Sequence, residues 1–498
     1  PYTESEKIAA FGLCVWDEKV PATFNAAVTI CGILHYLPAR EGTLLKELQR
    51  YGAETVFDLR DKFTGSGKIF DTDIESSGSR KCDVYLWMLN KFKNAVSKTL
   101  MGYYPDPFPI ISGYYDTTAH MNLPNLDYMV ANSCFVFDLS PWADEAPCDD
   151  PGQPLGTDYN TLTAILRELY TPDSFKSVAG FVHWHVKYTV HKNKGKHGEV
   201  ASEWEYGEIL SAYNAYLDAD AVGLGDLSNA SFYRFIKRNN YKNNKTPKIK
   251  NFSKNDKYLL YYMGDYDSAA WFNRTIPSFF GEKNSRGKYP LMWAFNPNLS
   301  DRVPHAFNYM FDRLTENDYV VPGDSCAGYL NPTLVLSPRK HSDLPPAPKA
   351  FTEHNKKYYA LYDTDVTGFL LNGNVELTEE TLDMYLEFSK GGVIQNHIDI
   401  PPFVYKGMPV AAMCNYYGDP SSTPESIAGA IEEKIYKEGN IEENFFAIRG
   451  VLVHPDVINK AFDILTEKHP DIKICDPYSF FAGIKKLVKR TKLEKKNI

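Results

Sequence analysis

Residues 258–280 read YLLYYMGDYDSAAWFNRTIPSFF, and this stretch decides the fold class. Its first six residues are apolar or aromatic, which is typical of a buried β-strand. Gly264-Asp265-Tyr266-Asp267 follows, and the apolar spacing from Ala269 to Phe280 then predicts an amphipathic helix. The stretch therefore predicts a strand, a short acidic loop and a helix, which is the repeating unit of parallel sheets.

The same unit recurs towards the end of the chain. The predicted strands are Tyr258–Met263, Leu291–Phe295, Tyr319–Val321, Tyr358–Tyr362, Gly392–Gln395, Pro409–Cys414, Phe445–Val453 and Ile472–Cys475. The predicted helices are Ala269–Phe280, Val303–Leu314, Thr378–Phe388, Thr423–Lys437, Pro455–Glu467 and Pro477–Val488. Eight strands in about 240 residues favour a C-terminal (β/α)8-type barrel, with an open doubly wound sheet as the alternative. No GxGxxG follows the first strand, which disfavours a dinucleotide-binding sheet.

The residues before the barrel predict smaller α/β subdomains. Their predicted elements are a helix or strand at Ala26–Leu34, helices at Leu44–Tyr51, Asp83–Leu100 and Leu162–Tyr170, a short buried strand at Thr55–Leu59, and strands at Cys134–Leu139 and Val178–His191. The proline-rich residues 105–109 interrupt regular structure, and the basic residues 241–251 are typical of a linker. We therefore expect an N-terminal α/β subdomain over residues 1–107, a second α/β region over 108–250 and the barrel over 251–498.

The composition is that of an ordinary folded protein with an acidic balance. Hydrophobic residues make up 43% of the chain and charged residues 23%, and 54 Lys and Arg stand against 63 Asp and Glu for a net charge of −9. An acidic surface repels a phosphate backbone, so we expect no nucleic acid partner. No apolar stretch of about 18 residues is present, so we expect no membrane-spanning helix.

The cysteines and the first residues of the chain bear on where the protein is located relative to the cell. Eight cysteines are scattered without a CxxC pair, which argues against a zinc module and leaves disulfides undecided. Pro1-Tyr2-Thr3-Glu4 has neither an initiator Met nor a signal segment and resembles a processed or trimmed end. We therefore expect a secreted protein, extracellular or periplasmic. The oligomeric state is not indicated by the sequence.

Aromatic residues are abundant, with 7 Trp, 34 Tyr and 29 Phe making up 14% of the chain. We expect most of these rings to fill cores, as at Tyr258 and Phe445, although flat aromatic faces also stack on sugar rings. A few aromatic residues lie at or just past the ends of predicted barrel strands: Trp271, Trp293, Tyr329, Tyr416 and Tyr417. For this subset a carbohydrate site is favoured over a phosphate site, because no Gly-rich loop ending in Gly-Lys-Ser/Thr is present.

Carboxylates also recur after predicted strands, where barrels carry their chemistry. Asp265 and Asp267 follow the first strand, and Asp363 and Asp365 follow the predicted fourth strand. These four are our candidate catalytic residues, since two carboxyl groups about 5 to 5.5 Å apart suit a retaining glycosidase and about 6.5 to 9.5 Å an inverting one. The same residues could instead hold a divalent cation or cap the following helices.

The candidate substrate-binding residues come from the same strand ends. They are Trp271, Trp293, Asp324, Ser325, Tyr329, Asn396, His397 and Tyr416. Aromatic members would line sugar subsites, while Asn396 and His397 could bond hydroxyl groups. A serine hydrolase is disfavoured, because no GxSxG is present and Gly323-Asp324-Ser325-Cys326 is not that motif.

Alternation along Val178–His191 raises the question of a metal site. His183 and His185 fall on the polar face of this predicted strand, and a His-x-His pair has metal-ligand spacing. Further possible ligands follow at His197, Glu203 and Glu205. We favour an exposed strand face with solvated histidines, and expect no metal and no cofactor.

Residues 317–332, NDYVVPGDSCAGYLNP, resemble the signature of the GxGYxYP family of putative glycoside hydrolases. Gly328, Tyr329 and Pro332 match, while Cys326 replaces the first Gly and Asn331 replaces the second Tyr of the motif. Further similar features are Asp265 and Asp267, Arg286-Gly287, Trp293, Asn296-Pro297, Val303-Pro304 and, upstream, Phe181–Thr189, Lys196–Gly198, Glu203–Glu205 and Asp218–Phe232. The resemblance implies N-terminal α/β subdomains, a C-terminal barrel, and an exported bacterial protein of sugar processing.

Three functions follow as hypotheses. The first is a glycoside hydrolase in which Asp265 or Asp267 pairs with Asp363 or Asp365 at the barrel mouth. The second is a non-catalytic glycan-binding or surface protein on a degenerate barrel, suggested by Cys326 and Asn331. The third is a metal-dependent hydrolase or deacetylase that uses Asp265, Asp267 and a histidine. A carbohydrate is the expected partner in the first two.

Overall fold

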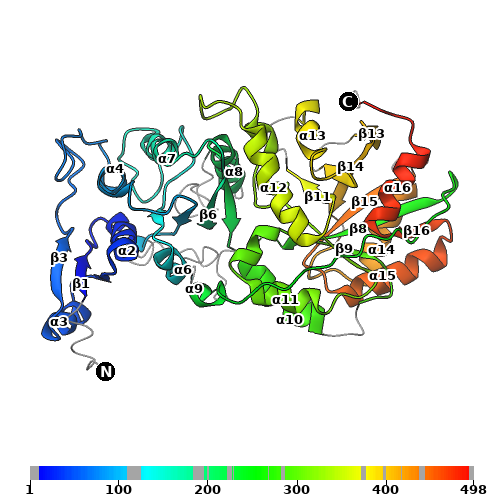
Figure 1. Cartoon of the computed structure of the whole chain (residues 1–498), viewed down its shortest axis with the longest axis horizontal. Helices are drawn as coiled ribbons and strands as arrows, with labels where there is room; N and C mark the ends of the chain where they lie inside the picture. Colours follow the sequence, from blue (N-terminus) through cyan, green and yellow to red (C-terminus); the bar gives the residue numbers. More distant parts are fainter. Residues whose placement is uncertain are drawn as a thin grey trace. The chain divides into compact units, whose positions relative to one another are not determined.

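A computed structural model shows the chain as two compact units. It describes residues 11–108, 125–182, 196–198, 201–220, 227, 229–266, 268–281, 286–371, 377–395, 400–416, 418–436 and 444–492. The N-terminal unit comprises Pro1–Phe232 together with Lys340–Leu344, and the C-terminal unit comprises Tyr233–Arg339 and Pro345–Ile498. Figure 1 shows the described elements of both units.

The N-terminal unit contains two parallel sheets among its described residues. β1 (Gly12–Val15), β2 (Leu37–Ala39) and β3 (Glu54–Asp58) form a sheet of order β2-β1-β3, and β4 (Leu100–Tyr103), β5 (Phe135–Phe137), β6 (Lys176–Gly180) and β7 (Ala215–Ala219) form one of order β5-β4-β6-β7. The helices are α2 (Ala22–Leu34), α3 (Thr43–Arg50), α4 (Arg80–Phe92), α6 (Leu126–Ala131), α7 (Thr157–Glu168), α8 (Ala201–Ala212) and α9 (Ala230–Tyr233).

Most predicted elements of this unit are present, with shifted ends. The sequence predicted either a helix or a strand at Ala26–Leu34, and these residues belong to helix α2. The predicted helix Asp83–Leu100 is too long, because α4 ends at Phe92 and Leu100 begins β4. The strand predicted as buried at Thr55–Leu59 is β3, but its first three residues, from Glu54, are exposed.

The C-terminal unit alternates strands and helices. Its strands are β8 (Lys257–Tyr266), β9 (Leu291–Phe295), β10 (Asp318–Val321), β11 (Val366–Leu370), β12 (Gly392–Gln395), β13 (Phe403–Tyr405), β14 (Met408–Tyr416), β15 (Phe445–Val451) and β16 (Ile472–Cys475). Its helices are α10 (Ala269–Gly281), η3 (Pro297–Asp301), α11 (Pro304–Phe311), η4 (Pro332–Val335), α12 (Pro348–Tyr362), α13 (Glu379–Tyr385), α14 (Pro424–Tyr436), α15 (Pro455–Lys468) and α16 (Pro477–Leu487).

These strands form one nearly closed, barrel-like sheet. The order is β10-β9-β8-β15-β14-β12-β11, all parallel, with β16 added parallel to β8 and β13 antiparallel to β14. β10 and β11, the two end strands of this order, are joined just after β10 by two backbone hydrogen bonds. Gly368 N–H donates to Pro322 O at 2.9 Å, and Ser325 N–H donates to Phe369 O at 2.6 Å. The predicted fold class, a C-terminal (β/α) barrel preceded by smaller α/β sheets, is confirmed.

One predicted strand is wrong. Tyr358–Tyr362 is the last turn of helix α12, and the fourth strand of the ring is β11, Val366–Leu370. Tyr358, Tyr359 and Tyr362 are all buried. A run with this spacing suits a buried helix face as well as a strand, so apolar content alone did not distinguish them.

Residues 241–251, which the sequence predicts as a linker, pack on the C-terminal unit. The Tyr241 ring stacks on Phe311 with centroids 4.4 Å apart. The side-chain amide of Asn243 pairs with both backbone groups of Val320, accepting its N–H at 3.1 Å and donating to its carbonyl. The segment therefore covers part of the β10 edge that β11 leaves unpaired.

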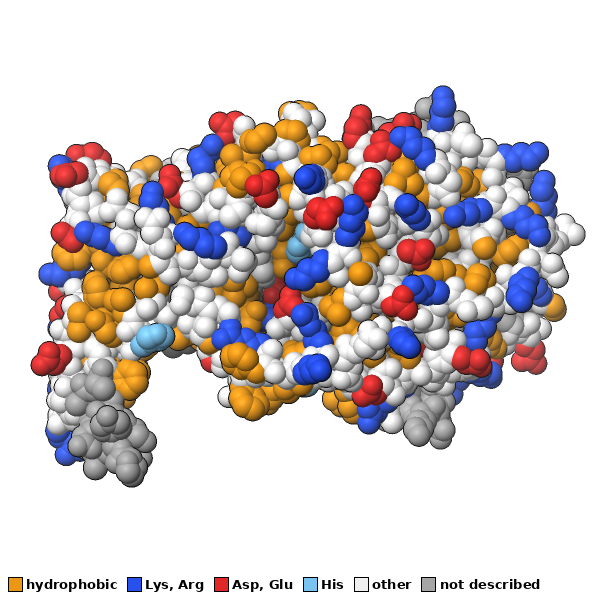
Figure 2. Space-filling model, viewed as in Figure 1, with side chains coloured by type: hydrophobic (Ala, Val, Ile, Leu, Met, Phe, Trp, Pro, Cys, Tyr) orange, Lys and Arg blue, Asp and Glu red, His pale blue; other side chains and the backbone are white. Residues whose placement is uncertain are grey.

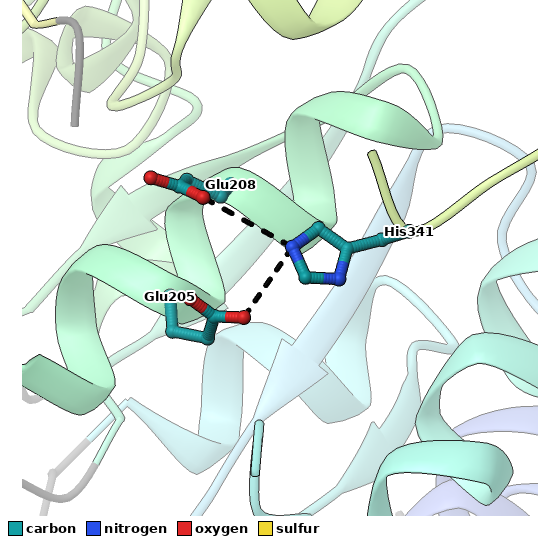
Figure 3. A group of neighbouring side chains, drawn as sticks. All are labelled: Glu205, Glu208 and His341. Carbon is teal, nitrogen blue, oxygen red and sulfur yellow. Dashed lines mark ion pairs between the residues drawn. The ribbon is translucent and has the colours of Figure 1, made fainter. Parts of the chain in front are cut away.

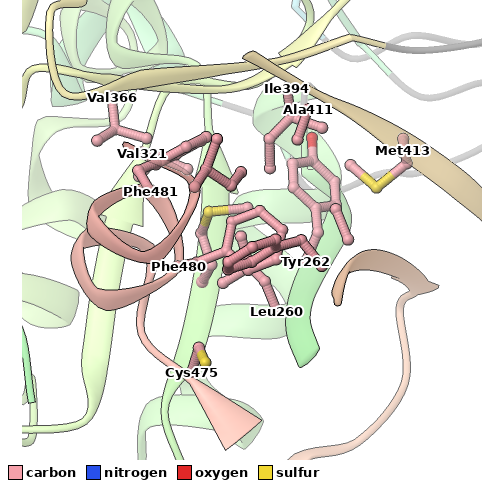
Figure 4. Close-up of a cluster of buried hydrophobic side chains, with 14 of the residues drawn as sticks. Leu260, Tyr262, Val321, Val366, Ile394, Ala411, Met413, Cys475, Phe480 and Phe481 are labelled. Atoms are coloured by element: carbon pink, nitrogen blue, oxygen red, sulfur yellow. The ribbon is translucent and has the colours of Figure 1, made fainter. Parts of the chain in front are cut away.

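The interior of the barrel-like sheet is filled with buried side chains, and those of helix α16 enter it at the amino ends of the strands. Alternate residues of β8, including Leu260 and Tyr262, point into a buried cluster with residues of the other strands (Figure 4). Phe480, Phe481 and Ile484 of α16 belong to the same cluster. Tyr258 stacks on Phe445 at 5.1 Å, which confirms that these rings fill the core. The helix α16 therefore closes the amino end of the barrel.

Three further features concern the cysteines, the helices and the surface. All eight cysteines are free thiols, so the disulfide question left by the sequence is answered for this structure. Within the described part of the chain, no helix has both the length and the apolar content needed to cross a bilayer. On the face shown in Figure 2, acidic and basic side chains are interspersed over the surface.

Candidate active site at the carboxyl edge of the C-terminal sheet

The carboxyl edge of three adjacent strands brings polar residues together. β8 ends at Asp265 and Tyr266, Asn296 directly follows β9, and Gly323, Asp324 and Ser325 follow β10. β8 pairs with β9 and β9 pairs with β10, all in parallel, so these three strand ends lie side by side. In parallel barrels this edge is where substrates bind.

Asn296 and Asp324 form the polar centre of this edge. Asn296 is 1% exposed, and its Nδ2 donates to Asp324 Oδ2 at 3.2 Å. Its Oδ1 is buried and has no hydrogen-bond partner among the described residues. A buried carbonyl oxygen without a partner costs about 1 to 3 kcal/mol, so the site is short of one donor that a bound molecule could supply.

The backbone at Asp324 and Ser325 is strained. Their φ angles are 41° and 82°, in the left-handed region that residues with a Cβ avoid at a cost of roughly 1 kcal/mol each. Asp324 is half-buried and Ser325 is buried. Consecutive non-glycine residues in this conformation persist only where the surrounding structure holds them, and such strain concentrates at functional sites.

Two elements hold this loop from outside. Leu371 N–H donates to Ser325 Oγ at 2.9 Å, next to the bond from Ser325 to Phe369. Further along the loop, Ala327 N–H donates to Asn355 Oδ1 at 3.0 Å, and His354 Nε2 donates to Ala327 O at 2.9 Å. The strained loop is therefore fixed by the end of β11 and by α12.

Two inward-facing residues that the sequence analysis did not predict as site residues, Tyr262 and Arg449, lie near this edge. A Cβ on Gly323 would lie 3.1 Å from the Tyr262 hydroxyl and 3.4 Å from Asn296 Oδ1. A Cβ on Gly264 would lie 3.4 Å from Arg449 Nε, and the Arg449 guanidinium lies 4.8 Å from the centre of the Phe369 ring. The available signal was strand alternation, because Arg449 is the one charged residue within the apolar strand β15.

The four predicted catalytic carboxylates do not gather at one edge. Asp265 is at the carboxyl end of β8, with only its backbone described, and Asp267 lies outside the described residues. Asp363 caps the C-terminus of α12 with a φ of 52° and pairs with Lys245, and Asp365 directly precedes β11. Both stand at the amino end of a strand parallel to β8, so the geometric premise for pairing them with Asp265 is wrong.

Trp293 was a candidate for sugar stacking, but it is fully buried. Its ring lies 4.8 Å from that of Phe280 in α10, and its Nε1 donates to Asp318 Oδ1 at 2.8 Å. Asp318 also forms an ion pair with Arg286 at 2.5 Å. A ring enclosed in this way offers no face to a ligand, so Trp293 is a structural residue.

The other aromatic candidates differ in their exposure. Trp271 is half-buried in the first turn of α10, which directly follows β8, and the Arg274 guanidinium lies 5.7 Å from its ring centre. Tyr329 is 7% exposed. Tyr416 ends β14, with only its backbone described, and Asn396 and His397 lie outside the described residues. Among the described candidates, Trp271 has the accessible aromatic face.

The two positions that depart from the family motif have local structural roles. Cys326 is fully buried, and burial raises the pKa of its thiol well above the usual range, so it is not a ready nucleophile. Asn331 caps η4, accepting from Thr333 N–H at 3.2 Å. The loop therefore keeps a defined shape without the glycine and tyrosine of the motif.

The possible metal ligands of the N-terminal unit separate. His183 and His185 lie outside the described residues. The His197 ring stacks on Trp142 at 3.4 Å, and its Nε2 lies 2.8 Å from Asp144 Oδ1. Of the possible ligands that the structure describes, only Glu205 lies in a cluster with metal-ligand geometry, where its neighbours are Glu208 and His341.

Comparison with known proteins places this geometry in a family context. Residues 255–410 match the family model described as the GxGYxYP putative glycoside hydrolase C-terminal domain. The match confirms the family resemblance for this part of the chain, which contains Asp265, Asn296 and Asp324. No curated protein matches the chain.

Two solved structures match the chain, one of them with a similar fold. The crystal structure of a putative hydrolase from Bacteroides thetaiotaomicron VPI-5482 superposes with a TM-score of 0.67 at 14% sequence identity, covering 98% of this chain and 84% of that one. A putative polysaccharide deacetylase from Mycobacterium smegmatis gives a TM-score of 0.32 at 8% identity, covering 52% of this chain and 100% of that one. The first similarity extends over both units and concerns the fold.

Proposed function

We propose that the protein is a glycoside hydrolase whose active site is the carboxyl edge of the C-terminal sheet. Asp324 and Asp265 are its two reacting carboxyl groups. The observation that carries this proposal is the strained pair Asp324-Ser325, held at the end of β10 by β11 and α12. The family match over residues 255–410 supports a glycosidic substrate.

The neighbours of Asp324 suggest its part in the reaction. Asn296 Nδ2 donates a hydrogen bond to one carboxylate oxygen of Asp324 and so fixes the direction in which the other oxygen of Asp324 points. A carboxylate oriented by an amide donor is suited to act in its ionised form, as the nucleophile or the base of a glycosidase. Asp265, two strands away along the same edge, would then be the acid that protonates the departing oxygen.

Substrate contacts would come from the residues around this pair. The Tyr262 hydroxyl and the Arg449 guanidinium are hydrogen-bond donors beside Gly323 and Gly264, where the backbone lacks a Cβ. The unpartnered Asn296 Oδ1 can accept from a sugar hydroxyl. Trp271, just beyond β8, offers an aromatic face for stacking.

The test is hydrolysis of a panel of oligosaccharides by the wild type and by Asp265→Asn. We expect wild-type product release and a loss of at least about 100-fold in kcat for Asp265→Asn, as for a missing general acid. NMR of the first product formed gives the anomeric outcome. Full turnover by Asp265→Asn would reject its role.

The glycan-binding alternative has a different outcome in the same experiment. Saturable binding of an oligosaccharide by the wild type, with no product after long incubation, would contradict hydrolysis. Binding that is lost in Asn296→Ala would then mark this edge as a lectin-like site, because Asn296 supplies both an amide donor and the free Oδ1.

A further inference from the structure

A second group of convergent side chains belongs to the N-terminal unit, whereas the sheet that carries Asp324 belongs to the C-terminal unit. Glu205 and Glu208 are three residues apart on α8, so they share one helix face. His341 approaches that face from the segment Lys340–Leu344 (Figure 3). Its Nε2 lies 3.4 Å from Glu205 Oε1 and 4.0 Å from Glu208 Oε2.

The imidazole of His341 is fixed from several directions. Its Nδ1 lies 3.0 Å from the Tyr159 hydroxyl, and its backbone carbonyl accepts from the Tyr213 hydroxyl at 2.8 Å. The adjacent Ser342 Oγ donates to Ala212 O, at the end of α8, at 2.8 Å. The ring is therefore held with its second nitrogen facing the two glutamates.

That second nitrogen lacks a hydrogen bond. The His341 side chain is 6% exposed, and Nε2 is buried without a hydrogen-bond partner among the described residues. With the ring proton on Nδ1, where the Tyr159 hydroxyl can accept it, the Nε2 lone pair faces carboxylate oxygens. This is an arrangement of three acceptors that a cation would stabilise.

The local charge is only partly balanced. Lys340 lies 2.8 Å from Glu208 Oε2 and 3.5 Å from Glu205 Oε2, and its side chain is 47% exposed. Among the described residues, the ion pairs at this cluster set one ammonium group against two carboxylates. Lys340 is therefore an exposed competitor that can swing into solvent when a stronger cation binds.

We propose that Glu205, Glu208 and His341 bind a divalent transition-metal ion, with Zn²⁺ as the best match. One imidazole nitrogen with two carboxylate oxygens is a ligand set that Zn²⁺ accepts, whereas Mg²⁺ and Ca²⁺ prefer oxygen alone. Ligand atoms around tetrahedral Zn²⁺ stand roughly 3.4 Å apart for bonds of about 2.1 Å, close to the spacing in this cluster. The ion would tie residues 340–344 to α8.

The test is metal titration of the full chain after chelator treatment and dialysis. Calorimetry with Zn²⁺ should give one ion per chain for the wild type, and Co²⁺ should give the visible bands of a bound ion. His341→Gln and Glu205→Gln should each weaken Zn²⁺ binding at least about tenfold, in line with the loss of one of three ligands. Absence of saturable binding in the wild type would overturn the proposal.

The chain offers a matched control in His469. This residue lies 3.2 Å from Glu432, which also pairs with Lys468, and within the described part of the chain Glu432 is the one carboxylate paired with it. His469→Gln should therefore bind Zn²⁺ like the wild type. Equal affinity in His341→Gln and the wild type would overturn the proposal, since the bound ion would then lie elsewhere.

A further variant separates a metal site from an ion-pair cluster. Lys340→Met removes the competing ammonium, so Zn²⁺ should bind at least as tightly as in the wild type and should raise the melting temperature. If the two glutamates and His341 instead serve only to neutralise Lys340, Lys340→Met would lower the melting temperature, and adding Zn²⁺ would not restore it. That second result would contradict the proposal. A cooperative melt of each variant in chelator checks that it is folded.

Discussion

The imidazole of His354 stabilises the loop that carries Asp324. Its Nε2 donates to Ala327 O, three residues after Asp324. Burial lowers the pKa of His354 from 6.5 to about 4. The folded protein therefore binds fewer protons than the unfolded chain between these two values, and the free energy of unfolding falls as the pH drops through this window.

Replacing His354 with Gln should remove this part of the pH dependence. The stabilising contribution is complete above pH 6.5 and is lost as the pH falls towards 4, by an amount on the order of 2 kcal/mol. Urea denaturation at pH 7.5 and pH 4.5 measures it. We expect the difference between the two pH values to be smaller in His354→Gln than in the wild type. An equal difference would show that His354 is not the titrating group.

The site roles of single residues were predicted from the residue types, and the surroundings of each residue in the fold decide whether it can have the predicted role. Asp265 and Asp324 lie at the carboxyl edge as expected. Trp293 was chosen because tryptophan stacks on sugars, but a strand has two faces and its ring is buried against α10. Asn296, which orients Asp324, was not among the candidate site residues.

At the scale of elements, one strand was exchanged for a helix. The apolar run Tyr358–Tyr362 belongs to α12, while β11 was missed because its sequence, VTGFL, contains Gly368, which weakens a strand pattern. That glycine is required, since a Cβ there would lie 2.6 Å from Val321 Cγ2 and 3.0 Å from the Tyr262 ring. A constraint imposed by two other strands cannot be seen in local sequence.

Asn243 makes a testable contribution to the closure of the sheet. Its side-chain amide satisfies the N–H and the carbonyl of Val320 on the β10 edge. Asn243→Ala should lower the free energy of unfolding by about 1 to 3 kcal/mol, because two backbone groups lose their partner. Urea denaturation measures the change. Asn239→Ala, at a nearby exposed position, is the control, and equal loss in both would contradict this role.

At the scale of the whole molecule, the sequence predicted the barrel-like C-terminal sheet and the smaller α/β sheets before it. The repeating strand-helix pattern was strong enough for this, since periodicity is a local signal. It did not show which carboxylates share an edge, because that depends on the direction and order of paired strands. It also did not predict Glu208 or His341, since residues far apart in the chain meet only in the folded unit.

Two compact units should unfold as two calorimetric transitions. In the N-terminal unit the buried Lys81 pairs with Asp158 at 2.6 Å and with Asp149 at 2.8 Å, so Asp158→Asn should lower one transition by removing one of two buried partners of this ammonium group. Asn243→Ala should lower the other. A single transition that both variants shift equally would show that the chain unfolds as one cooperative body.

The central claim is that chemistry occurs at the carboxyl edge of the C-terminal sheet. Its most direct test compares Asp324→Asn with Asp363→Asn in the hydrolysis of an oligosaccharide that the wild type cleaves. Both positions have left-handed φ angles, which asparagine tolerates, so both variants should fold. We predict that Asp324→Asn lowers kcat at least about 100-fold and that Asp363→Asn, at the amino end of β11, does not. Loss of activity in Asp363→Asn with normal turnover in Asp324→Asn would contradict the claim.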